Sequence, residues 1–186
     1  ALYRYPSQKL QGVILSGTGW LRQATLAAGL ALCHAEAHKY GQTGVSPLLQ
    51  DMMFGAYNRS IPGASTKDDW ICTDPKVVEA YASDPLSGGA CTVGLAQQML
   101  QGIRENQKPA NLKKMQKTLP VLLFSGDQDP VGNRGKGVRR TAEAFREAGM
   151  QEVTVTLYPG YRHEMLNEPC KEQVYEDVRH WMEARL

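Results

Sequence analysis

The sequence predicts a three-layer α/β protein in which helices cover a mostly parallel sheet. A short apolar run, Val121–Phe124, lies between Pro120 and Gly126 and is typical of a strand that is buried on both faces. A second run, Val153–Leu157, alternates valine with threonine and also indicates a strand. The residues between the two runs have the pattern of a helix. Because a strand–helix–strand unit has a right-handed crossover, we expect the two strands to be parallel.

An acid and a histidine follow these two strands. Asp129 comes after the first strand and His163 after the second, and the carboxyl ends of parallel strands meet at one edge of a sheet. A carboxylate beside an imidazole fixes the tautomer of the ring and stabilises its charged form, as in two members of a nucleophilic triad. Asp127 lies in the same turn and is the alternative acid, and a loop histidine without a catalytic role is the alternative for His163. Pro130 favours Asp129, because a residue before proline has an extended backbone that can direct its carboxylate across the strand ends.

Two further elements complete the predicted sheet layer. Leu10–Leu15 has the apolar pattern of a third strand, and it ends in the small-residue turn Ser16–Gly19. The C-terminal residues predict an amphipathic helix that begins at Pro169 and packs on the sheet. His180 lies on this helix, and we expect it to be structural.

A helical insertion of about residues 22 to 105 separates the third strand from the other two. Alanine-rich composition, N-terminal capping residues and proline at first helical positions indicate its helices. Residues Ala56–Asp69 are polar, and we expect them to be irregular. The helices are predicted at Gln23–Tyr40, from Ser46-Pro47 through Phe54, from Asp74-Pro75 to the turn at Ser83-Asp84-Pro85, and from Thr92 onward.

Four stretches of this sequence resemble one known fold family. They are Tyr3–Gly19 (YRYPSQKLQGVILSGTG), Asp69–Leu86, Gly126–Val131 (GDQDPV) and Leu157–His163 (LYPGYRH). Together they resemble the α/β-hydrolase fold, in which the chain order is nucleophile, acid, histidine. More narrowly, they resemble the monoacylglycerol lipase and lysophospholipase branch of the serine hydrolases. The resemblance implies the three-layer α/β-hydrolase fold, with Asp129 as the acid of a G-x-x-D pattern and His163 as the histidine.

The nucleophile of this family is a serine in a G-x-S-x-G motif, and these residues contain no such motif. The neighbours of Ser16, Ser65, Ser87 and Ser125 all fail to match it. We therefore expect residues 1–186 to be the C-terminal portion of one α/β-hydrolase domain, with the serine and the oxyanion donors upstream of residue 1. Residues 1–10 would then be the tail of the helix that follows the nucleophile. The missing N-terminal half, or another chain, is expected to cover the open sheet edge.

The resemblance also implies that the insertion forms a cap that supplies much of an acyl-binding surface. We expect Met53, Phe54, Leu86 and Val131 to contribute to substrate binding. Methionine and phenylalanine adapt to irregular apolar shapes. Ordinary core packing is the alternative for Met53 and Phe54.

Composition excludes several other classes of function. The net charge is +2 with scattered basic residues, so neither nucleic acid nor an anionic membrane is an expected partner. No apolar run is long enough to cross a membrane, and no signal peptide is recognisable, so we expect a cytoplasmic protein. The four cysteines form no C-x-x-C pair, and the zinc-protease pattern at His163-Glu164 fails at Asn167. We expect no metal and no cofactor.

The expected reaction is hydrolysis of a carboxylic ester on a glycerol-linked acyl chain, by an upstream serine together with His163 and Asp129. These residues alone should be inactive. The same scaffold supports other chemistry, so two alternatives stay open. One is a related hydrolase of amide or peptide substrates. The other is a binding module that has no nucleophile.

Overall fold

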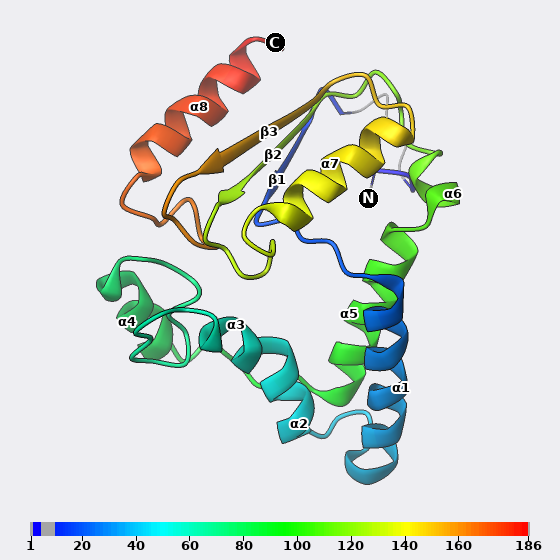
Figure 1. The fold of residues 1–186 in the computed structure, drawn as a ribbon, viewed down its shortest axis with the longest axis vertical. Helices are drawn as coiled ribbons and strands as arrows, with labels where there is room; N and C mark the ends of the chain where they lie inside the picture. The colour runs from blue at the N-terminus through cyan, green and yellow to red at the C-terminus, as the bar shows by residue number, and fades with distance from the viewer. Residues whose placement is uncertain (1, 5–9, 186) are drawn as a thin grey trace.

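The computed structural model describes residues 2–4 and 10–185, and it divides into a sheet layer with its covering helices and a helical cap (Figure 1). The predicted helical tail at residues 1–10 lies largely outside the described residues. In Figure 1 the sheet occupies the upper half and the cap the lower half. The chain enters the cap after the first strand and leaves it before the second, so the cap is an insertion, as predicted.

The described part of the sheet has three parallel strands in the order β1-β2-β3. They are β1 (Val13–Ser16), β2 (Val121–Gly126) and β3 (Val153–Tyr158). All six residues of β2 are buried, which confirms the prediction from its apolar run. Leu123 pairs with Leu15 on one side and with Val155 on the other, so the three carboxyl ends lie at one edge.

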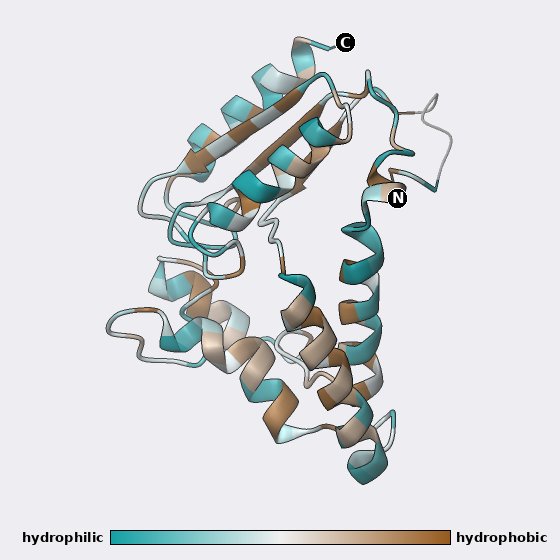
Figure 2. Cartoon of the chain, turned by 45° about the vertical axis from the view of Figure 1, so that its right-hand side comes forward, coloured by the Kyte–Doolittle hydropathy of each residue, from teal (hydrophilic) through white to brown (hydrophobic). Residues whose placement is uncertain are grey.

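Helices cover both faces of the sheet. The helix α7 (Lys136–Glu147) shares a core cluster with Val121 and Leu123, whereas α8 (Lys171–Glu183) shares one with Leu122 and Phe124. Alternate residues of a strand point to opposite faces, so the two helices lie on opposite sides and the predicted three layers are confirmed. Figure 2 shows the strands as the most hydrophobic part of this layer, with the outer surface of α8 hydrophilic.

The C-terminal helix begins later than predicted. Its first residue is Lys171, not Pro169. The backbone N–H of Lys171 closes a turn on the carbonyl of Glu168 at 2.9 Å, and the first hydrogen bond of helical spacing joins Val174 to Cys170 at 3.2 Å. Pro169 therefore lies in a turn, because the chain is still closing around Glu168 at that point.

The cap contains the predicted helices. The helices α1 (Gln23–Tyr40) and α5 (Val93–Asn106) pack side by side (Figure 1). Three of the predicted capping residues accept a backbone N–H at a helix start: Ser46 from Leu49 at 3.2 Å, Asp74 from Lys76 at 2.9 Å and Thr92 from Leu95 at 3.2 Å. The other cap and connecting helices are α2 (Pro47–Gln50), α3 (Ala56–Arg59), α4 (Pro75–Ser83) and α6 (Pro109–Leu112).

The prediction of an irregular segment at Ala56–Asp69 is wrong for its first four residues. A π-helical turn, η2 (Asp51–Gly55), joins α2 to α3, so one helical path runs from Pro47 to Arg59. An ion pair at 2.5 Å between Arg59 and Asp51 spans this path. Polar composition alone did not reveal the helix, because the packing of Tyr57 on Trp70 is a tertiary contact, and the exposed ion pair contributes little to stability.

Candidate active site

The carboxylate of Asp129 is fully buried at the carboxyl edge of the sheet. Its Oδ1 accepts the backbone N–H of Val131 at 2.8 Å, and its Oδ2 accepts the hydroxyl of Ser125 at 2.9 Å. The loop that carries it is held by the N–H of Arg134, which donates to the carbonyl of Asp129 at 2.8 Å. A buried carboxylate held by several donors has a fixed orientation.

The imidazole of His163 is the third partner of Asp129. Its Nδ1 lies 3.0 Å from Oδ2 of Asp129, so the predicted proximity of acid and histidine is confirmed. Because Nδ1 faces a carboxylate acceptor, the neutral ring is held in the tautomer with its proton on Nδ1 and its lone pair on Nε2. The side chain is 28% exposed, and among the described residues Nε2 has no hydrogen-bond partner. Nε2 is therefore the nitrogen that can accept a proton from another group.

The alternative acid has a different role in the structure. Asp127 accepts the backbone N–H of Gly160 at 2.7 Å and the amide of Gln128 at 3.0 Å. Asp127 therefore joins its own turn to the loop after β3, and Asp129 is the acid that bonds the imidazole.

The turn after β1 packs directly on the histidine ring. Gly17 has a φ of +62°, and a Cβ added to it would lie 2.6 Å from Cε1 and 2.8 Å from Nδ1 of His163. Glycine is required here both for the left-handed backbone and for the space that the ring occupies. The predicted small-residue turn thus forms one wall of the site.

The cap forms another wall through two aromatic residues. The ring of Trp70 lies 5.3 Å from that of His163, and the ring of Tyr57 lies 5.4 Å from that of Trp70. Burial raises the pKa of the Tyr57 phenol, and the negative charge of Asp129 raises it further. Tyr57 therefore stays neutral at physiological pH. The sequence analysis missed both residues. Trp70 lies in the stretch Asp69–Leu86 that resembles the family, but no role at the site was assigned to it, and Tyr57 lies in no such stretch.

A cavity of about 470 Å³ opens in the cap beside Trp70. Aromatic and polar side chains line it, including Phe54, Tyr81, Lys67 and the buried carboxylate of Asp68. A pocket of this size and mixed lining suits a small organic ligand. Trp70 lines this cavity and also contacts His163, so it links the cavity to the acid–histidine pair.

The structure places the four residues expected to bind substrate at different points. Phe54 lines the cap cavity. Met53 is partly buried and packs against the cluster that contains Cys33 and Cys91, which is the core-packing alternative. Val131 adjoins Asp129 through its backbone N–H. Leu86 is 94% exposed and is not part of the cavity lining. A role for these residues in binding substrate stays a prediction.

The described residues contain no group of three or more histidine, cysteine, aspartate or glutamate side chains that could hold a metal ion. His34 and His38, four residues apart on α1, are exposed, and all four cysteines are free thiols. No helix in the part of the chain that the structure describes is long and apolar enough to cross a membrane.

The parallel strands, the acid and histidine at their carboxyl ends and the helical insertion are features of the α/β-hydrolase fold. Comparisons with known proteins agree. The family described as serine aminopeptidase, S33, matches residues 1–170, and the chain belongs to this family. A monoacylglycerol lipase of Mycolicibacterium smegmatis (strain ATCC 700084 / mc(2)155) is 32% identical over 151 residues, which cover 77% of this chain and 49% of that protein.

Solved structures that share the fold include an esterase and a lipase. A thermostable carboxyl esterase from Bacillus coagulans in complex with glycerol superposes with a TM-score of 0.84 at 24% identity, over 95% of this chain and 57% of that one. A lipase in an open form gives a TM-score of 0.79 at 25% identity, with the same coverage of 95% and 57%. The chain spans about half the length of its curated relative, at 49%.

Proposed function

We propose that the protein containing this chain is a serine hydrolase that cleaves carboxylic esters of glycerol-linked acyl chains, as a monoacylglycerol lipase or lysophospholipase does. The observation that carries the proposal is the buried Asp129 carboxylate 3.0 Å from Nδ1 of a histidine whose Nε2 is unoccupied among the described residues. The similarity to a monoacylglycerol lipase supports it. In this proposal the nucleophilic serine and the oxyanion donors come from a segment outside these 186 residues.

The chemistry follows from the orientation of the imidazole. The serine hydroxyl attacks the ester carbonyl carbon while Nε2 of His163 takes its proton. The same proton then passes to the leaving alcohol, and an acyl-enzyme forms. Water repeats the sequence in reverse: Nε2 takes a proton from water, the acid leaves and the serine regains its hydrogen. Asp129 keeps the proton on Nδ1 and stabilises the imidazolium in both halves of the cycle.

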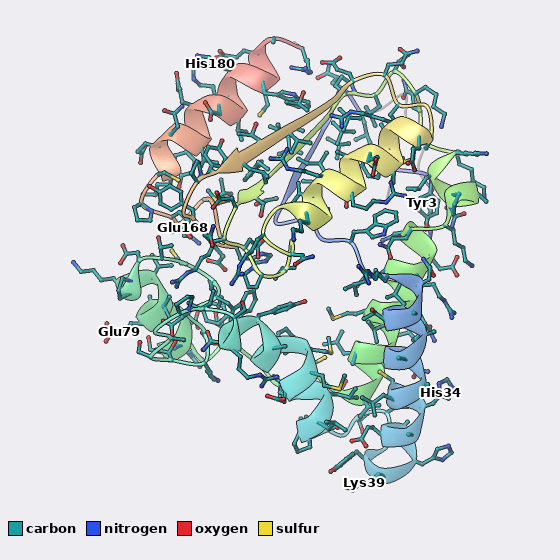
Figure 3. All side chains as sticks on the ribbon, in the orientation of Figure 1. Tyr3, His34, Lys39, Glu79, Glu168 and His180 are labelled. Atoms are coloured by element: carbon teal, nitrogen blue, oxygen red, sulfur yellow. The ribbon has the colours of Figure 1, made fainter. Side chains whose placement is uncertain are left out.

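Replacing the histidine tests this role directly. His163→Ala should abolish nearly all ester hydrolysis while leaving the fold intact, because the serine then has no base. His180→Ala is the matched control, since His180 is exposed on the outer side of α8 (Figure 3) and should change nothing. Near wild-type turnover in His163→Ala would refute the mechanism.

An amide substrate is the second candidate, because the family that matches is described as a serine aminopeptidase. The two candidates share the acid, the histidine and the serine, so the site geometry does not separate them. A panel of monoacylglycerols, lysophospholipids, nitrophenyl esters and aminoacyl amides does. We expect the glycerol esters to have the highest kcat/KM. A preference for aminoacyl amides would replace the ester proposal with the peptidase.

The free side of β1 is where we propose that another segment pairs. Among the described strands β1 pairs only with β2, and an apolar cavity of about 330 Å³ lies beside it, lined in part by Val13, Leu15 and Phe145. The strand that carries the nucleophile would bring the serine to the edge where His163 lies. If no such segment exists in the protein, the chain is a binding module. The expected cytoplasmic location also stays a prediction.

A further inference from the structure

A second buried carboxylate lies next to the histidine loop. Glu168 is fully buried and occupies the boundary between the sheet layer and the cap (Figure 3). Its two oxygens accept the backbone N–H of Arg162 at 2.7 Å and that of Thr73 at 3.0 Å. They also accept the hydroxyl of Thr73 and, at 3.4 Å, the thiol of Cys72. Three of these four donors belong to the cap.

Arg162 makes the reciprocal contacts. Its guanidinium donates to the backbone carbonyls of Asp69 at 2.5 Å and Cys72 at 3.0 Å. We call residues 69–73 the cap strap. Glu168 accepts hydrogen bonds from the strap and Arg162 donates to it, so the strap and the histidine loop are joined in both directions.

The strap in turn holds His163. The backbone carbonyl of Ile71 accepts the N–H of His163 at 3.1 Å and the N–H of Glu164 at 2.9 Å. Trp70, also in the strap, places its ring 5.3 Å from the imidazole. The backbone and the ring of His163 are therefore both positioned by cap residues, although the histidine itself follows a strand of the sheet.

A carboxylate suits the position of Glu168 because every group that points at it is a donor. An ionised carboxylate has about four acceptor sites and no proton to donate. Glutamine has the same shape but would turn an –NH₂ toward donors and leave some of them unpaired and buried. Burial raises the pKa of the Cys72 thiol to about 12, so this group keeps its proton and donates at physiological pH.

We propose that Glu168 is a positioning residue that holds the cap strap against the histidine loop and thereby keeps the imidazole of His163 aligned with Asp129. The inference rests on the proposed function for its kinetic consequence. Its structural consequence, the state of the Nδ1–H···Oδ2 hydrogen bond, can be measured without any substrate.

The experiment compares Glu168→Gln with Glu172→Gln in the protein that contains this chain. Glu172 is an exposed glutamate four residues further on, so it controls for the loss of one negative charge. Two readouts are needed: steady-state kinetics on a monoacylglycerol, and the far-downfield proton NMR signal of an imidazole N–H bound to a carboxylate. A thermal unfolding curve shows that each variant folds.

Glu168→Gln should lower kcat by about 10- to 100-fold, the loss typical of a misplaced catalytic group. KM should change less than kcat, since Glu168 itself does not line the cap cavity. The downfield signal should broaden or disappear. Glu172→Gln should match the wild type in both readouts. Thr73→Val removes one donor to Glu168 and keeps the side-chain shape, so it should show a smaller decrease in kcat and a weaker change in the imidazole signal. This variant replaces Glu168→Gln in the experiment if Glu168→Gln does not fold.

Three outcomes would overturn the proposal. The first is a folded Glu168→Gln with wild-type kcat and an unchanged imidazole signal. The second is a Glu168→Gln in which only KM changes. The third applies if only Thr73→Val folds, and is wild-type kcat and signal in that variant. If the wild-type protein hydrolyses no ester and the signal still depends on Glu168, the proposed function fails while the positioning role stands.

Discussion

Replacing Gly17 by alanine is expected to disable the site through a single methyl group. The added Cβ would lie 2.6 Å from Cε1 and 2.8 Å from Nδ1 of His163. To restore ordinary van der Waals separation the imidazole must move by about 1 Å. Such a shift stretches the 3.0 Å hydrogen bond to Asp129 and displaces Nε2, and a misplacement of about 1 Å can cost roughly 100-fold in rate. We therefore expect kcat of Gly17→Ala to fall by about 100-fold.

The same substitution also strains the backbone, and a second glycine separates the two effects. Gly17 has a φ of +62°, where alanine is disfavoured by about 1–2 kcal/mol. Gly63 has a φ of +70° but no atom within 4 Å of an added Cβ. The backbone strain in Gly63→Ala should therefore lower the free energy of unfolding, measured by urea titration, by a similar amount, and the variant should keep the turnover of the wild type.

The comparison of the two variants gives a clear refutation. If Gly17→Ala retains wild-type kcat and the downfield imidazole signal, the ring does not pack on this turn as described. If Gly63→Ala loses turnover as Gly17→Ala does, the loss comes from backbone strain and instability, not from contact with His163.

Two further predictions follow from the burial and hydrogen bonding of individual groups. Asp129→Asn should lower kcat by about 10,000-fold with the fold retained, because an amide no longer holds the proton on Nδ1. Asp127→Asn, in the same turn, is the control and should have a kcat close to that of the wild type. Burial raises the pKa of the Cys72 thiol from 9.0 to about 12. The protonated thiol therefore contributes its full share of the free energy of unfolding below pH 9, and this contribution is lost as the pH rises toward 12. Between roughly pH 8 and pH 10, titration of this thiol should lower the free energy of unfolding by about 1 kcal/mol. Cys72→Ser should flatten this decline when the free energy is measured by urea titration at each pH. If the slope of free energy against pH is the same in Cys72→Ser as in the wild type, the thiol is accessible to water in the folded protein.

The sequence by itself determined the sheet and the acid–histidine pair. A continuous apolar run, an alternating run and the helical pattern between them are local signals, and the parallel arrangement follows from the handedness of the crossover. Once β2 and β3 are parallel neighbours, the loops that carry Asp129 and His163 lie at the same edge, where the G-x-x-D pattern and Pro130 favour Asp129 over Asp127. The helix starts at Ser46, Asp74 and Thr92 were predictable for the same reason, because a capping residue acts within three or four positions of itself.

Only the tertiary structure decided how the cap reaches the site. Trp70 packs against His163, Tyr57 packs against Trp70, and Glu168 accepts the backbone N–H of Arg162. The sequence analysis assigned none of these roles, and the hydrogen bonds of Glu168 to Thr73 span 95 positions in the sequence. Such contacts depend on how the cap packs against the sheet layer, which local propensity does not encode. The late start of α8 has the same origin, since Glu168 is held by the cap strap before the helix begins.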